Sequence, residues 1–251
     1  MTTIFCFTST GNSLSAAKKL AGSLSGEVLP MNNGNTKCDS DVIGFVFPVY
    51  FWGLPRMVER FVKEMEITNK NAYVFSVITC GGSCFGVLGL LKNLLRSKGV
   101  QLKYGAMLIS PSNYLPEYVA KDSDELRQKF DENISSISNS IKNRESNHML
   151  TFTVLNKIIY AACPNENCDR FFTVMSACTG CGTCAKVCPA KNISIEDDNP
   201  EFHHRCEHCL ACLHNCPVNA IDWKNKTQNK PRFRNSGVAL DELISFNNNQ
   251  Q

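Results

Sequence analysis

A pattern of four cysteines that occurs twice in the last third of the chain constrains its fold more than any other feature. The first copy is Cys178-x-x-Cys181-x-x-Cys184-x-x-x-Cys188-Pro189. The second copy, 28 residues further on, is Cys206-x-x-Cys209-x-x-Cys212-x-x-x-Cys216-Pro217. Three thiols at this spacing let a short loop wrap one face of a compact inorganic cluster, and the proline ends the turn after the fourth thiol. The repeat therefore predicts two related halves around two related sites.

Small residues between these cysteines let backbone amides approach a cluster: Gly180, Gly182, Thr183 and Ala211. Residues 172–222 resemble a bacterial-type ferredoxin with two [4Fe–4S] clusters. The resemblance implies that the fourth cysteine of each run binds the cluster of the other run. The ligands are then Cys178, Cys181, Cys184 and Cys216 for cluster one, and Cys206, Cys209, Cys212 and Cys188 for cluster two. The alternative is a pair of zinc sites, although zinc sites usually use two separated pairs of ligands.

Cysteine content also bears on where such a chain works. The chain has fourteen cysteines, and Met1–Phe7 shows neither the basic nor the apolar stretch of an export signal. We therefore expect a cytoplasmic protein that uses its clustered cysteines for metal rather than for disulfides. The formal net charge of +3 is too small to indicate nucleic-acid binding. The apolar stretch 149–162 is shorter than the roughly 20 residues of a membrane span, so we expect none.

Residues 1–147 alternate between strand-like and helix-like segments. The expected strands are 3–8, 27–31, 41–48, 72–79 and 100–109, and the expected helices are 12–25, 56–65, 84–97 and 123–144. The last of these helices has a clear apolar face, made by Leu126, Phe130, Ile134, Ile137 and Ile141. This alternation predicts an α/β domain with a doubly wound, five-stranded parallel sheet of the flavodoxin-like type.

The loop after the first strand has the composition of a phosphate site. Its hydroxyls, amide and backbone N–H groups precede a helix N-terminus, which favours an anion. The loop resembles the phosphate loop of flavodoxins, and this implies FMN binding through Thr8, Ser9, Thr10, Gly11, Asn12 and Ser13. It lacks the lysine of a triphosphate-binding loop and the three glycines of a dinucleotide fingerprint. The alternative is an ordinary polar turn.

Two further loops follow the third and fourth expected strands, where FMN lies in this fold. Consecutive aromatic residues after the third strand are candidates for packing on the flavin ring, in a loop comprising Pro48, Val49, Tyr50, Phe51, Trp52 and Gly53. The fourth strand ends in a loop of small residues that lets the backbone approach the flavin, comprising Thr79, Cys80, Gly81 and Gly82. Packing under the next helix, and a plain turn, are the respective alternatives.

The chain as a whole resembles the fusion family in which a flavodoxin-like domain precedes a bacterial-type ferredoxin. The resemblance covers roughly residues 1–235 and implies FMN binding and low-potential electron transfer. We expect a flavodoxin-like domain over 1–147, a connector over 148–168, a small α+β ferredoxin domain with little regular structure over 169–225, and a tail over 226–251 whose last residues are disordered.

Three functions remain open at this point. The first is an electron-transfer oxidoreductase that passes electrons between two [4Fe–4S] clusters, FMN and a soluble redox partner or small-molecule acceptor. The second is a flavin-dependent reductase of a small organic substrate, with its pocket between Tyr50–Trp52 and Pro111–Tyr114. The third is a redox sensor, for which no effector domain is visible.

Some residues fall outside these motifs. We expect Cys80 and Cys84 to be structural thiols, because no adjacent basic group lowers a thiol pKa. We favour no metal site at Cys163 and Cys168, and solvated charge for the basic run 224–234. Protonation of His208, inside the second cysteine run, is a hypothesis for tuning cluster two.

Overall fold

The computed structural model describes residues 1–32, 34, 36–84, 86–149 and 166–248. Its main sheet has five parallel strands, β1 (Thr2–Cys6), β2 (Glu27–Pro30), β4 (Val42–Pro48), β6 (Tyr73–Cys80) and β7 (Leu102–Ile109). They lie in the order β2-β1-β4-β6-β7. Numbered by these five strands alone, the order is 2-1-3-4-5, which is that of the flavodoxin-like fold. The predicted fold class is confirmed.

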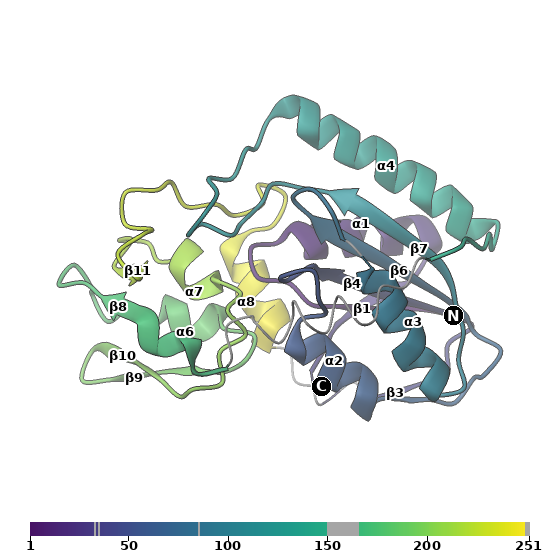
Figure 1. Cartoon of the computed structure of the whole chain (residues 1–251), viewed down its shortest axis with the longest axis horizontal. Helices are drawn as coiled ribbons and strands as arrows, with labels where there is room; N and C mark the ends of the chain where they lie inside the picture. The colour runs from purple at the N-terminus through teal and green to yellow at the C-terminus, as the bar shows by residue number, and fades with distance from the viewer. Residues whose placement is uncertain (33, 35, 85, 150–165, 249–251) are drawn as a thin grey trace.

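Helices cover both faces of this sheet (Figure 1). One face carries α1 (Asn12–Leu24) and α4 (Asp124–Lys142), and the other carries α2 (Arg56–Glu64) and α3 (Val87–Ser97). All eight residues of β6 are buried, as a central parallel strand requires. All four helices and all five strands fall within three residues of the ranges predicted from the sequence.

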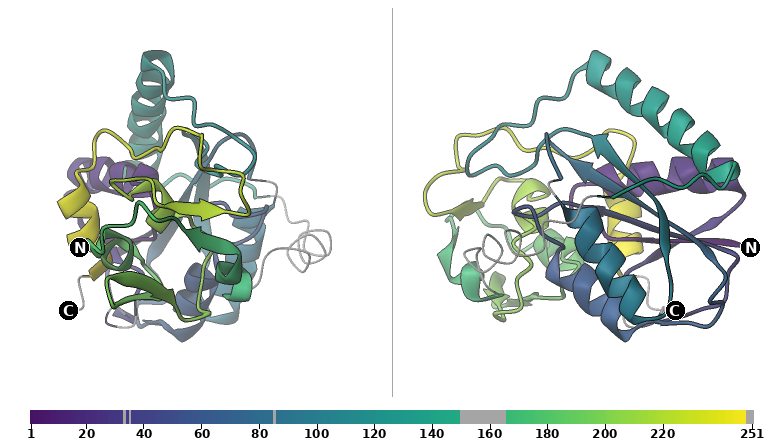
Figure 2. Two further views of the ribbon diagram at one scale, coloured as in Figure 1. Left: turned by 90° about the vertical axis from the view of Figure 1, so that its left-hand side faces the viewer. Right: turned by 45° about the vertical axis from the view of Figure 1, so that its right-hand side comes forward.

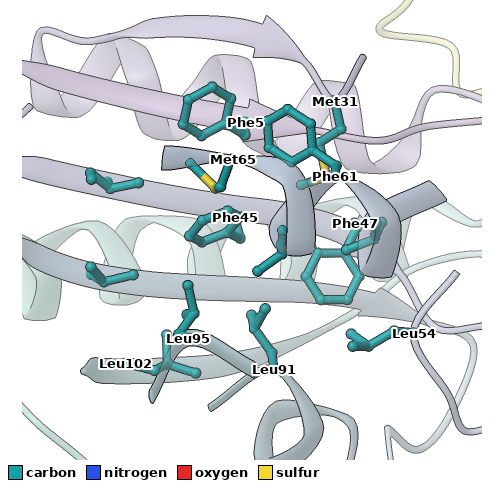
Figure 3. Packing of buried hydrophobic residues seen from close by; sticks show 14 of the residues in the cluster. Phe5, Met31, Phe45, Phe47, Leu54, Phe61, Met65, Leu91, Leu95 and Leu102 are labelled. Carbon is teal, nitrogen blue, oxygen red and sulfur yellow. The ribbon is translucent and has the colours of Figure 1, made fainter. Parts of the chain in front are cut away.

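Two apolar cores lie on opposite sides of the sheet. Figure 3 shows the core under α2 and α3, where aromatic and aliphatic side chains from strands and helices meet, among them Phe5, Phe45, Phe47, Phe61 and Leu91. The core under α1 and α4 contains Leu14, Leu20, Ile134 and Ile137. Each fully buried aromatic or aliphatic side chain contributes about 2 kcal/mol. This rigid frame holds the loops at the carboxyl ends of the strands.

A short parallel pair, β3 (Lys37–Cys38) with β5 (Glu66–Ile67), was not predicted.

The cysteine-rich part contains more regular structure than we expected. After a 3-10 helix over Glu166–Phe171 it forms β8 (Phe172–Val174), α6 (Thr183–Val187), β9 (Ile193–Glu196), β10 (Asn199–Phe202), α7 (Ala211–His214) and β11 (Ile221–Trp223). β9 pairs with β10, and β11 pairs with β8, both antiparallel. The expectation of little regular structure was therefore wrong. Each cysteine run is followed by a strand at the same offset, Ile193 after the first and Ile221 after the second.

The C-terminal segment ends in a helix, and residues 249–251, part of the end that the sequence predicts to be disordered, lie outside the described residues. Helix α8 (Leu240–Asn248) lies between the sheet and the cysteine-bearing elements in two views (Figures 1 and 2). The Asn247 amide donates to the Val187 carbonyl at 2.9 Å, which ties α8 to the end of α6. Lys18 on α1 pairs with Glu242 on α8. Residues up to Asn248 are thus part of the folded chain.

No helix within the described residues has the length and apolar character that crossing a membrane requires. Most of the expected connector, and most of the apolar stretch 149–162, lie outside the described residues.

Candidate functional site

The structure brings the first set of cysteines around one hollow. The hollow has a volume of ≈ 330 Å³, part of it open to solvent, and its lining includes Cys178, Cys181, Cys184 and Cys216. Its other walls are small or apolar, with Ile195, Pro200 and Val218 among them. Burial, together with the neighbouring thiols Cys216 and Cys181, raises the pKa of Cys184 to about 11. A bound iron cluster counteracts this by stabilising thiolates. The donor set and the space therefore fit an iron–sulfur cluster.

The second set of cysteines is also brought together, deeper in the molecule. Burial raises the pKa of Cys212, and the neighbouring thiols Cys206, Cys209 and Cys188 raise it further. Backbone N–H groups already point at two sulfurs, from Asn192 to Cys188 at 3.3 Å and from His208 to Cys206 at 3.2 Å. Amides that donate to cluster sulfurs stabilise the reduced form, so this arrangement suits a cluster as well.

The described residues also bear on the zinc alternative. Among them, no three His, Cys, Asp or Glu side chains converge closely enough to hold one metal ion. A zinc site needs its thiolates within about 2.3 Å of a single point, whereas each thiolate of a cubane binds a different iron atom. A cubane accepts thiolates that are spread in this way.

The loop Thr8–Ser13 lies between β1 and α1, as predicted, and its polar side chains are buried. Gly11 has a φ of 96°, in the left-handed region that favours glycine. The Gly11 N–H donates to the Thr8 hydroxyl at 3.2 Å, and the Ser13 hydroxyl bonds that of Thr79 at 2.8 Å. The loop is thus joined to the carboxyl end of β6, at the switch point between β1 and β4 where FMN binds in this fold.

Groups from distant parts of the chain cover this loop. The Asn113 amide donates to the hydroxyls of Ser9 at 3.0 Å and Thr10 at 2.9 Å. The Asn235 N–H donates to the Thr10 carbonyl at 2.8 Å, and its side chain donates to that of Asn12 at 3.0 Å. A Cβ on Gly11 would lie 3.0 Å from the Cβ of Val238. We call Asn235–Val238 the C-terminal strap. The donors suit a phosphate, but the strap and Asn113 must yield to admit one.

The aromatic loop forms a tight turn. Tyr50 and Gly53 exchange two backbone hydrogen bonds, and Phe51 and Trp52 between them have φ of 48° and 54°. Turns with two left-handed central residues normally carry Asn or Gly, so two aromatic residues here carry a conformational cost. Trp52 is 48% exposed, while the hydroxyl of Tyr50 is buried without a hydrogen-bond partner.

In the remaining predicted flavin loop, two residues are buried and two are exposed. Thr79 and Cys80 are buried at the end of β6, whereas Gly81 and Gly82 are exposed. A Cβ on Gly81 would meet that of Ser112 at 2.7 Å, so the loop needs glycine there. Burial raises the pKa of Cys80 to about 11 and raises the pKa of Cys84, which is consistent with structural thiols.

The cysteine-bearing domain and the segment after it contact the loop 111–118 of the flavodoxin-like domain. His214 Nδ1 accepts from the Phe233 N–H at 3.1 Å, so Nε2 carries the proton and donates to the Asn113 carbonyl at 2.7 Å. Lys230 donates to the carbonyls of Leu115 at 2.8 Å and Pro116 at 3.0 Å. Part of the basic run 224–234 therefore holds the two domains together. The expectation that this charge is solvated was wrong for that part.

The sequence did not single out several of these contacts. Asn113, Asn235 and His214 act across more than ninety residues of chain, and no local pattern marks them. Glu207 was missed although a signal existed, since the two cysteine runs differ at that position.

Cys168 is buried beside Cys206, and Cys163 lies outside the described residues. Burial lowers the pKa of His208 to about 4, and the hypothesis that its protonation tunes cluster two stays a prediction.

Comparison with known families decides the nature of the cysteine-bearing domain. Residues 177–221 match the family described as 4Fe-4S dicluster domain. The chain joins a flavodoxin-like domain to an iron–sulfur domain. Among curated proteins, NADH-quinone oxidoreductase subunit I of Pelobacter propionicus is 37% identical over 82 residues. The match covers 27% of this chain and 44% of that subunit, less than half of the relative's length.

Solved structures give weaker similarities. The Trp repressor binding protein of Bacillus subtilis is 11% identical, with 55% of this chain and 96% of that chain covered and a TM-score of 0.42. The FMN-dependent NADH-azoreductase of Bacillus anthracis, in complex with FMN, is 9% identical with 56% and 98% covered and a TM-score of 0.41. A putative flavoprotein of Bacteroides eggerthii is 19% identical with 52% and 95% covered and a TM-score of 0.36. These scores are low, and the fold assignment rests on the strand order.

Proposed function

We propose that this protein is an electron-transfer flavoprotein that passes electrons between two [4Fe–4S] clusters, one FMN and an external redox partner. One observation supports this most strongly. The domain that matches a 4Fe-4S dicluster family packs on the loop 50–53 at the carboxyl edge of a sheet with flavodoxin strand order, and the segment that follows this domain packs on the loop 8–13. Redox centres placed at this edge have a short path between them.

Each group has its own proposed residues. Cluster one is held by Cys178, Cys181, Cys184 and Cys216, and cluster two by Cys206, Cys209, Cys212 and Cys188. The phosphate of FMN binds at Thr8–Ser13, and its ring lies beside the loops Pro48–Gly53 and Thr79–Gly82. The clusters supply one-electron chemistry and FMN can pair electrons. No disulfide joins any two of the thirteen cysteines that the structure describes, and we propose a cytoplasmic, reducing setting.

The small-molecule reductase has no comparable support. Its pocket was expected between Tyr50–Trp52 and Pro111–Tyr114. Phe51 packs edge-on against Tyr114 there, with ring centroids 5.3 Å apart. The partner is therefore proposed to be a soluble redox protein or a small acceptor that reaches the iron–sulfur domain.

Flavin titration of the anaerobically purified, flavin-depleted protein tests this function. We expect FMN to bind in a 1:1 complex and much more tightly than riboflavin, because the loop Thr8–Ser13 is proposed to bind the phosphate that riboflavin lacks. Thr10→Asp places a negative charge in the loop and should abolish the preference for FMN while leaving the iron content unchanged. Asn93→Asp, which adds the same charge at an exposed position of α3, is the control. Equal binding of FMN and riboflavin by the unmodified protein, or no binding of either, contradicts the proposal.

A further inference from the structure

The two cysteine runs differ at the two positions between their first and second cysteines. Run one has Thr179-Gly180, and run two has Glu207-His208. In run one Thr179 is exposed and Gly180 is half-buried, and the following Cys181 is exposed. Run two buries them, so that Glu207 is 5% and His208 is 3% exposed. The repeat is therefore symmetric in its ligands and asymmetric in its surroundings.

The backbone at these positions is nevertheless the same. Gly180 has a φ of 66°, and its counterpart His208 has a φ of 52°. Gly182 and its counterpart Leu210 have φ of 72° and 60°. Non-glycine residues adopt this conformation only at a free-energy cost. Run two carries that cost where run one uses glycine, so the His208 side chain must make contacts that offset it.

Glu207 contacts the flavodoxin-like domain. One carboxylate oxygen accepts from the Met57 N–H, in the first turn of α2, at 3.1 Å. The other lies 3.6 Å from the Arg60 guanidinium. A carboxylate at a helix N-terminus meets unpaired N–H groups and the positive end of the helix dipole. The side chain thus joins the cluster-two loop to the helix that follows the aromatic turn.

His208 contacts the aromatic turn itself. Its ring stacks on Phe51, with centroids 5.8 Å apart and planes 11° apart, and it lies 4.9 Å from the Trp223 ring. Tyr114 meets the same ring edge-on at 5.6 Å. Neither ring nitrogen of His208 has a hydrogen-bond partner. The next residue, Cys209, packs against the core that contains Phe7 and Phe47. Every residue from Glu207 to Cys209 therefore faces the flavodoxin-like domain.

We propose that the clusters have fixed places, with cluster two as the inner cluster, docked on the flavin edge by Glu207 and His208, and cluster one as the outer cluster that exchanges electrons with the partner. This order rests on the proposed function. The thiolates of the two sets would hold the outer and the inner cluster, and the clusters would supply one-electron transfer, in which no bond forms or breaks. The residues at positions 207 and 208 act by positioning the inner cluster.

The double variant E207T/H208G tests this order, because it gives run two the residues of run one. The loop should still bind iron, since Thr-Gly serves at the equivalent place, while the docking contacts are lost. Thr179→Ser, at the matched position of run one, is the control. Iron release to excess bathophenanthroline disulfonate from flavin-free protein is expected in two phases, each about half of roughly eight irons. The double variant should release all its iron in the fast phase, and T179S should keep both phases.

A second measurement follows the electron in FMN-loaded protein. A laser-generated deazaflavin radical gives one electron to the exposed cluster, and its arrival at FMN should be slowed in E207T/H208G but not in T179S. Single-phase iron release from the unmodified protein, a retained slow phase in the double variant, or unchanged arrival of the electron overturns the proposal. If FMN does not bind, the proposed function fails, while iron release still decides the order of the clusters.

Discussion

At the scale of single residues, the sequence identified the side chains whose type and spacing carry chemistry. The eight cysteines and the loop Thr8–Ser13 are recognisable because their partners are local or because a cluster demands the spacing. The sequence could not show that the hydroxyl of Tyr50 is buried unpaired, because this depends on how the two domains meet. The same holds for Asn113, whose contacts with Ser9 and Thr10 join the loop after β7 to the loop after β1.

Tyr50→Phe tests the unpaired hydroxyl. An unpartnered buried hydroxyl costs about 1–3 kcal/mol, so its removal should leave flavin-free protein equally or slightly more stable. If the hydroxyl donates to bound flavin, the variant loses a hydrogen bond worth about 1 kcal/mol, a few-fold in FMN affinity. Fluorescence titration and thermal unfolding measure the two effects. Tyr118→Phe, at an exposed tyrosine, is the control. Unchanged FMN affinity in Y50F would show that the flavin does not use this group.

Gly11→Ala tests the backbone of the phosphate loop. The left-handed φ of 96° and the close Cβ of Val238 should make the variant about 1–2 kcal/mol less stable. Gly22→Ala, on the exposed side of α1 with no atom within 4 Å of the new Cβ, should instead be more stable by up to about 1 kcal/mol. Denaturant unfolding of flavin-free protein compares the pair. Equal stability of the two variants would mean that the loop does not hold its compact form.

At the scale of elements, periodicity and turn residues predicted the flavodoxin-like domain to within a few residues, because its strands and helices are long and their apolar patterns are strong. The short elements β8–β11, α6 and α7 were missed, since three- to five-residue segments between cysteines have no periodicity to read. Helix α8 ends with Asn247 and Asn248, whose side-chain amides donate hydrogen bonds to carbonyls of α6. Its stability is therefore tertiary in origin.

Asn235→Ala tests whether the C-terminal strap controls access to the phosphate loop. The variant removes the side-chain bond to Asn12, and FMN should associate with the flavin-depleted protein faster than in the unmodified chain. Stopped-flow flavin fluorescence measures the rate. Asn248→Ala, which removes a bond from α8 to the Lys186 carbonyl, should leave the rate unchanged. A slower association in N235A would mean that the strap builds the site and does not close it.

At the scale of the whole molecule, the two domains depend on different forces. The flavodoxin-like domain has two large apolar cores, whereas the core of the iron–sulfur domain is small and includes the cysteines themselves. Domains of this size rarely fold without a metal or another cross-link. The sequence predicted both domains but not their contact, because docking depends on residues at the contact, such as Glu207 and Lys230, that follow no repeat.

Removal of the clusters should therefore unfold one domain and spare the other. After iron is chelated, hydrogen exchange should become fast at amides of β8–β11 and stay slow in β1, β4 and β6. Mass spectrometry of peptides from the two regions compares chelated protein with the protein as purified. Loss of protection in both regions to the same degree would show that the clusters also hold the flavodoxin-like sheet together.

The most direct test of the account is the iron, sulfide, zinc and flavin content of a single anaerobic preparation. The account predicts about eight iron and eight sulfide per chain, as two cubane clusters require, together with one FMN bound or readily taken up. Zinc in place of iron, iron for a single cluster, or a protein that takes up no FMN would contradict it.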